Sequence, residues 1–185
     1  VSLTITEKGY FYNEKRNLDE TNPLIQQDAK LPDLPKTAYG YLLKGLQARR
    51  AANAGPVTIM SCDNLPGNGE LTHHLVVQFA QLADPSMVEW INQNTSFPNA
   101  MVDRITPVTT DAIREILADT YNVEDAWPVV CEGYIQWVLE DNFIAGRPAL
   151  EKVGVQLVKD VEPYEKMKVR LLNGSHSVLS YISYL

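Results

Sequence analysis

A lysine, an asparagine and a histidine stand on one apolar stretch near the end of the chain, 168-KVRLLNGSHS-177. A lysine carries protons when burial lowers its pKa, an asparagine amide can donate to a developing oxyanion, and a histidine can hydrogen-bond a hydroxyl or carbonyl. At about 100° per residue of α-helix, Asn173 lies about 140° round from Lys168 and His176 about 80°. The three share a wide sector, which fits either a proton-transfer site or the solvent side of an amphipathic helix.

A second polar cluster, 61-SCDNLPGNG-69, follows an apolar run. Asp63 and Asn64 fall at the carboxyl end of the predicted strand, where open α/β sheets collect ligands. Turn chemistry explains the same residues equally well, because Asp, Asn, Pro and Gly all favour turns. The cluster is therefore either part of a site or a simple turn.

A third cluster, 97-FPNAMVDRITP-107, sets Asp103 and Arg104 among apolar residues and prolines. Either Asp103 serves a site, or the two residues form an internal ion pair. His73 and His74 are neighbours on a predicted helix and face different ways. Since no tight cluster of histidine, cysteine and carboxylate is present, we predict no catalytic metal.

Alternating strands and helices must position these clusters. We expect strands at 1–7, 57–64, 96–107, 137–143 and 153–161, a long loop at 8–34, and helices at 36–53, 69–83, after Pro85, at 109–121 and at 163–185. This alternation predicts the α/β class.

The composition and charge of the chain limit the classes of partner that it can bind. The 185 residues carry a net charge of −7 and no run of lysines or arginines, which argues against a nucleic-acid partner. No apolar run approaches the ~20 residues of a spanning helix, so we expect no membrane partner. The two cysteines form no CxxC pair, which is typical of reduced thiols in a cytoplasmic protein. The chain opens at Val1 inside a strand-like run, and we expect it to be a piece of a longer protein.

Several long stretches together resemble the mannitol dehydrogenase family: VSLTITEKGY, MSCDNLPGNG, FPNAMVDRITP, DAWPVV, QWVLEDNF and GRPALEKVGVQLVKDVEPYEKMKVRLLNGSH. The family comprises the polyol-specific long-chain dehydrogenases/reductases, among them mannitol 2-dehydrogenase, fructuronate reductase and tagaturonate reductase. The resemblance covers nearly all of 1–185 apart from 11–34. It implies metal-independent hydride transfer between NAD or NADP and a polyol or sugar acid, of the mannitol/fructose or mannonate/fructuronate type.

The resemblance also implies an architecture. Residues 1–160 would be the later part of a Rossmann-type domain, and 161–185 would begin a mainly helical domain, with the active site between them. The glycine-rich cofactor loop of such domains is not found in the sequence. Which polyol or sugar acid is used, and whether NAD or NADP serves, therefore stay open.

The family's signature is lysine, four residues, asparagine, two residues, histidine, and 168–176 matches it without a break. By this resemblance Lys168 is the general acid/base, and Asn173 with Asn64 holds the reacting oxygen. The resemblance also implies that His176 and Asp103 bind and orient the substrate or the lysine. Glu165, one turn before the lysine, is a candidate proton relay to solvent. The alternative is a non-catalytic sugar-binding or regulatory relative with the same fold.

Overall fold

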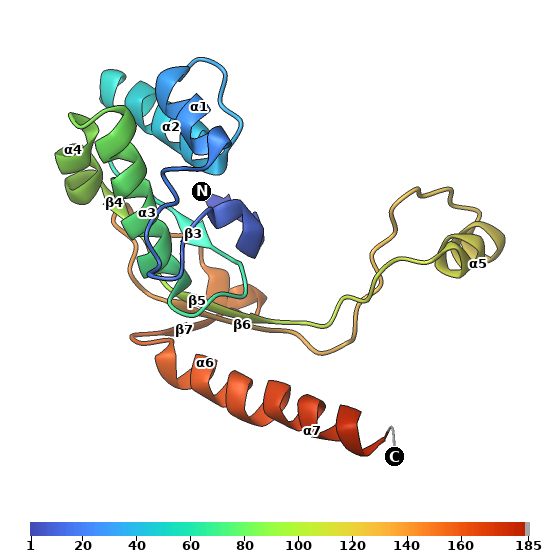
Figure 1. The fold of residues 1–185 in the computed structure, drawn as a ribbon. Helices are drawn as coiled ribbons and strands as arrows, with labels where there is room; N and C mark the ends of the chain where they lie inside the picture. The colour runs from blue at the N-terminus through green and yellow to red at the C-terminus, as the bar shows by residue number, and fades with distance from the viewer. Residues whose placement is uncertain (184–185) are drawn as a thin grey trace.

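Figure 1 shows the computed structural model, which describes residues 1–183, as a layered body with a long arm and a final helical rod. Helices α1, α2 and α4 lie at one end of the body, the strands lie across its middle, and the rod lies at the other end. In chain order the elements are β1 (Ser2–Leu3), η1 (Glu7–Tyr10), α1 (Pro23–Lys30), α2 (Ala38–Ala51), β2 (Val57–Thr58), β3 (Met60–Ser61), α3 (Asn68–Ala83), α4 (Met87–Asn94), β4 (Thr95–Ser96), β5 (Ala100–Asp103), α5 (Asp111–Tyr121), β6 (Gln136–Glu140), η2 (Leu150–Val153), β7 (Gln156–Val158), α6 (Glu162–Met167), η3 (Lys168–Asn173) and α7 (Gly174–Ile182).

The strands form three short sheets. Parallel pairing joins β1 to β3 and β2 to β4, so the apolar run 57–64 serves two partners rather than one. In the third sheet β6 lies in the centre, antiparallel to β5 and parallel to β7. Parallel pairs linked by helices confirm the α/β class.

The prediction of one long loop over 8–34 is wrong, because this segment contains α1. The Asn22 side chain accepts the backbone N–H of Leu24, and Pro23 stands in the first helical turn. An asparagine cap followed by proline is a recognised start signal, but the polar composition of the segment masks it. The strand expected over 1–7 is also shorter, because η1 begins at Glu7.

The main core lies between the helices and β3. It buries Ile25 of α1, Leu43 of α2, Leu75 and Phe79 of α3, and Ile91 of α4. Two smaller apolar clusters pack around β5 and β6, one with Ala100, Leu139 and Val155 and the other with Met101, Val138 and Val161. The second cluster ties the start of the rod to the sheet, and so fixes where the final helix begins.

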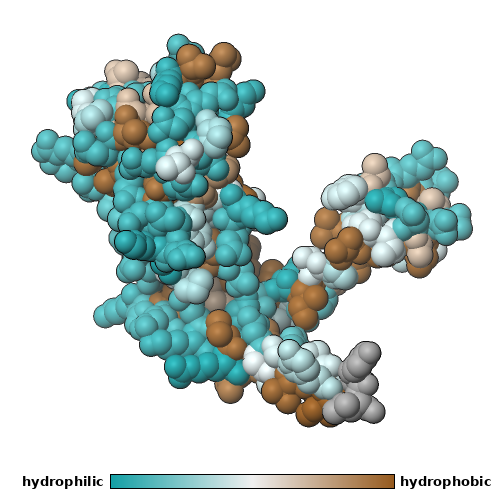
Figure 2. Space-filling view, viewed as in Figure 1, coloured by the Kyte–Doolittle hydropathy of each residue, from teal (hydrophilic) through white to brown (hydrophobic). Residues whose placement is uncertain are grey.

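An arm formed by 104–135 leaves the body and carries α5 at its tip (Figure 1). The Thr110 hydroxyl caps α5 by accepting the N–H of Ile113. Apolar side chains are exposed along the arm and along α7, and Figure 2 shows them as brown patches. Among residues 1–183, no helix is both long and apolar enough to cross a membrane.

The helix expected over 163–185 is present as one rod made of α6, η3 and α7, and its last two expected residues lie outside the described part. The segment Lys168–Asn173 is π-helical, which periodicity did not predict. A π segment inside a helix often marks a functional site.

Candidate active site

The structure brings Lys168, Asn64 and Asp103 together from three separate segments. The Nζ of Lys168 donates to the carbonyl of Val102 at 2.6 Å and to Asn64 Oδ1 at 3.1 Å. It also lies 3.6 Å from Asp103 Oδ1, and the two side chains are only 10% and 12% exposed. The turn after β3, the end of β5 and the rod therefore meet at one ammonium group.

The internal pair between Asp103 and Arg104, the alternative that the sequence left open, is wrong. Asp103 faces Lys168 instead. The Arg104 Nε donates to the carbonyl of Glu132, whose carboxylate accepts the N–H of Ile105. These contacts hold the base of the arm together where it leaves β5.

Strand geometry explains why a backbone carbonyl is available to the lysine. Glu140 N–H donates to the carbonyl of Asn99, and the pairing register then makes Ala100 and Val102 non-hydrogen-bonded positions toward β6. β5 is an edge strand, so these two residues point their N–H and C=O groups away from the sheet. The carbonyl of Val102 is thus free to accept Lys168.

The buried side chain of Asn68 binds Ala100, the other residue whose N–H and C=O point away from the sheet at this edge. Its Nδ2 donates to the carbonyls of Ala100 and Asp63, and its Oδ1 accepts the N–H of Ala100. One amide therefore replaces a neighbouring strand and ties β5 to the turn that carries Asn64. Sequence reasoning missed Asn68, because an asparagine in a Pro-Gly-Asn-Gly run is first taken as a turn residue.

The π turn affects the placement of Asn173. An α-helix would put it about 140° from Lys168, whereas a turn closed by i→i+5 bonds is wider and brings these two residues closer to alignment. Asn173 accordingly lines both cavities that Lys168 lines, of about 100 and 290 Å³. His176 lines the larger one together with Asn64 and Asp103, and no hydrogen bond of its ring is found among residues 1–183.

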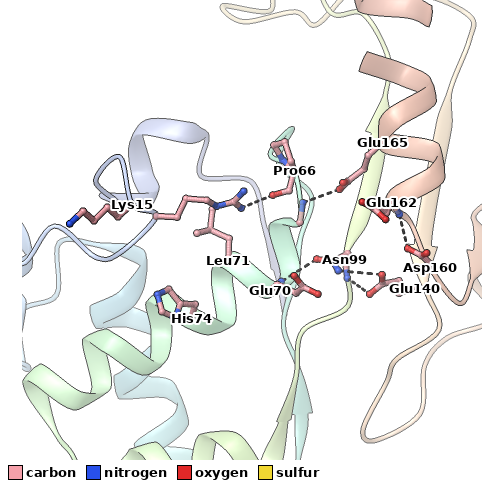
Figure 3. A pocket seen from close by; sticks show the side chains of 12 residues that line it. Lys15, Pro66, Glu70, Leu71, His74, Asn99, Glu140, Asp160, Glu162 and Glu165 are labelled. Atoms are coloured by element: carbon pink, nitrogen blue, oxygen red, sulfur yellow. Dashed lines mark hydrogen bonds between the residues drawn. The ribbon is translucent and has the colours of Figure 1, made fainter. Parts of the chain in front are cut away.

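Glu165 lies between the lysine and a wider, open cavity of about 520 Å³. Its Oε1 accepts the N–H of Gly67 at 3.1 Å, and Figure 3 shows the side chain reaching toward the turn at Pro66. Burial raises the pKa of Glu165, and nearby carboxylates raise it further, while the Gly67 N–H and the Arg16 charge oppose the shift. The other acidic residues lining this cavity are Glu70, Glu140, Asp160 and Glu162.

The N-terminus of α3 offers no seat for the diphosphate of a dinucleotide. Dinucleotides place this group on free N–H groups where a strand meets a helix. Here the Gly67 N–H is bound by Glu165, and the N–H groups of Gly69 and Glu70 are both bound by Asn99 Oδ1. The five carboxylates that line the adjoining cavity outnumber its two cations, Lys15 and Arg16, and would repel a phosphate. The N-terminus of α3 therefore does not fit the diphosphate of NAD, whereas Lys168 and the residues around it could exchange a proton with a substrate. Among these residues, no three histidine, cysteine or acidic side chains gather as metal ligands.

A family model described as "Mannitol dehydrogenase Rossmann domain" matches residues 1–152. Mannitol 2-dehydrogenase of Neosartorya fischeri is 52% identical over 98% of this chain, and that of Cereibacter sphaeroides is 51% identical over all of it. The chain spans 37% and 39% of the length of these two relatives.

Two solved structures share the fold. A Pseudomonas fluorescens mannitol 2-dehydrogenase, in ternary complex with NAD and D-mannitol, superposes with a TM-score of 0.90 at 52% identity, covering 100% of this chain and 38% of that one. A substrate-free D-sorbitol dehydrogenase gives 0.89 at 44% identity, covering 95% of this chain and 37% of that one.

Proposed function

The chain belongs to the mannitol dehydrogenase family, and on that premise we propose that the intact protein oxidises a polyol of the D-mannitol type, with NAD as hydride acceptor. Lys168 is the general acid/base. The observation that carries the proposal is the Lys168 Nζ itself, held by Asn64 and the Val102 carbonyl within an unbroken lysine–asparagine–histidine signature. When bound, NAD takes the hydride in oxidation and returns it in reduction.

The contacts of Lys168 suit proton transfer in both directions. A neutral amine has two N–H groups, and the two acceptors found here can take both, which leaves the nitrogen lone pair to receive the alcohol proton. The ammonium form has three N–H groups, so one remains to return the proton to the oxygen of a ketose. The carboxylate of Asp103 lies 3.6 Å from the Nζ, within the distance of an ion pair with the ammonium form.

The two asparagines are suited to hold the reacting oxygen. The Oδ1 of Asn64 is bound to Lys168, which leaves its Nδ2–H groups for a substrate oxygen. Asn173 lines the same cavity from the rod. Amide donors fixed before the reaction stabilise a developing alkoxide more than they stabilise the neutral alcohol. His176 and Asp103 complete the wall that orients the substrate hydroxyls.

Glu165 is placed to exchange the lysine proton with solvent. It lines the small cavity with Lys168 on one side and the open acidic cavity on the other. Its raised pKa brings the carboxyl closer to the range in which it can both accept and release a proton. Replacement by glutamine should slow steps that need proton exchange while leaving the substrate contacts in place.

Absorbance of NADH separates this function from a non-catalytic sugar-binding relative. The intact protein is mixed with NAD⁺ and D-mannitol, and with NADH and fructose, fructuronate or tagaturonate. The proposal expects turnover with mannitol and fructose. Turnover with fructuronate alone would move the substrate to the sugar acids. Silence across the panel, with sugar binding retained, would favour the binding protein.

A further inference from the structure

The carboxylate of Asp63 is buried, and no ion pair with it is found among residues 1–183. It is 8% exposed and accepts three hydrogen bonds from the start of the chain, from the N–H groups of Ile5 at 3.0 Å and Thr6 at 2.9 Å and from the Tyr10 hydroxyl at 2.8 Å. Thr6 has φ of 63°, a conformation that a threonine adopts only when its surroundings impose it. The segment is thus bent so that two successive N–H groups meet one carboxylate.

The main chain of Asp63 is fixed as well. Its N–H donates to Ser61 Oγ, and its carbonyl accepts the N–H of Leu65 and the side chain of Asn68. The next residue is Asn64, whose side chain is exposed and bound to Lys168. Because hydrogen bonds hold both the side chain and the main chain of Asp63, they set the direction in which the Asn64 side chain leaves the backbone.

We propose that Asp63 is a positioning residue for the reaction and acts through Asn64. The inference rests on the proposed function, in which Asn64 holds the lysine and the reacting oxygen. Asp63 and Lys168 line the same small cavity, so the path from one residue to the other is short. A shift of the turn by a fraction of an ångström would misalign an oxyanion donor, whose loss costs about 10²–10³ in turnover.

A second buried carboxylate provides the matched control. Asp28 is 1% exposed and also accepts backbone N–H groups, from Lys36 and Thr37, and a hydroxyl, from Thr37. Asp28 belongs to α1 and binds the residues at the start of α2, and these two helices lie at the end of the body away from the rod (Figure 1). Substitution by asparagine removes the same kind of interaction at both places, but only Asp63 adjoins the site.

The test compares Asp63→Asn with Asp28→Asn in the intact protein. Urea unfolding measures the stability of each variant, and NADH formation from D-mannitol, well below the unfolding transition, gives kcat and KM. We expect both variants to lose stability, and Asp63→Asn alone to lose about tenfold or more in kcat. Equal kcat values for the two variants would overturn the proposal.

A double-mutant cycle with Asn64→Ala shows whether the effect passes through that residue. If it does, Asp63→Asn lowers kcat much less in the Asn64→Ala background than alone. The same factor in both backgrounds would overturn the proposal while leaving Asn64 in its role. No effect of Asn64→Ala would instead reject the role of Asn64 in the proposed function, and the inference with it.

If Asp63→Asn fails to fold, Tyr10→Phe replaces it. That variant removes one donor to the Asp63 carboxylate and keeps the ring. Tyr39→Phe is its control, because it removes a buried hydroxyl that donates to the Tyr10 carbonyl and not to Asp63. A kcat loss confined to Tyr10→Phe supports the proposal, and equal kcat values reject it.

Discussion

Replacing Asn68 by alanine should be among the most destabilising single changes in this chain. The side chain is fully buried and forms three hydrogen bonds with backbone groups. The carbonyl of Asp63 keeps the N–H of Leu65, so its loss costs little. The N–H and C=O of Ala100 face away from β6, and among residues 1–183 the hydrogen-bond partner found for both is Asn68. At about 1–3 kcal/mol for each buried group left without a partner, the change costs about 2–6 kcal/mol.

Urea unfolding of the intact protein, followed by circular dichroism, measures this loss against Asn92→Ala. Asn92 is exposed and bonds His73 at the surface, so its removal should change stability by no more than about 0.5 kcal/mol. Activity of Asn68→Ala should also fall, because Asn68 joins the turn of Asn64 to the strand of Asp103. If the two variants unfold alike, Asn68 does not complete the edge of β5, and the account of that edge is refuted.

Further changes test the same framework. Gly69→Ala should lose about 1–3 kcal/mol, because the new Cβ would lie 2.6 Å from the carbonyl carbon of Pro98, whereas Gly45→Ala on α2 has open space and should be neutral or gain up to about 1 kcal/mol; paired urea titrations measure both. The raised pKa of Glu165 means that the folded state binds more protons than the unfolded state between the ordinary and the raised pKa, so stability should fall as pH rises through that window. Glu165→Gln should remove this part of the pH dependence, and a pH series of unfolding midpoints that keeps the same slope in the variant would contradict the shift.

The α/β class and most helices follow from periodicity and from cap and turn signals, as α2, α3 and α5 show. The residues around the lysine are harder to read from sequence. No residue type in the sequence indicates that the carbonyl of Val102 binds the lysine, because its availability follows from the register of β5 on β6. The role of Asn68 depends on the edge strand β5, which is distant in the sequence and comes next to Asn68 only when the chain folds.

The final helix shows the same limit in another form. Spacing on an ideal α-helix put Lys168 and Asn173 about 140° apart and left their shared role open. The π turn changes that angle, and in the folded chain the Lys168 Nζ is bound to β5 and to the turn after β3. Helix α1, by contrast, has a local start signal in Asn22 and Pro23, which the polar composition of 8–34 masks.

The most direct test of the central claim is the turnover of Lys168→Ala in the intact protein, with Lys166→Ala as its control. Lys166 lies on the same rod and pairs with Glu162 at the surface. The rate of NADH formation from D-mannitol should fall about 10²–10⁴-fold for Lys168→Ala, with an unchanged circular dichroism spectrum, and should hardly change for Lys166→Ala. Equal turnover of the two variants would contradict the assignment of Lys168 as the general acid/base.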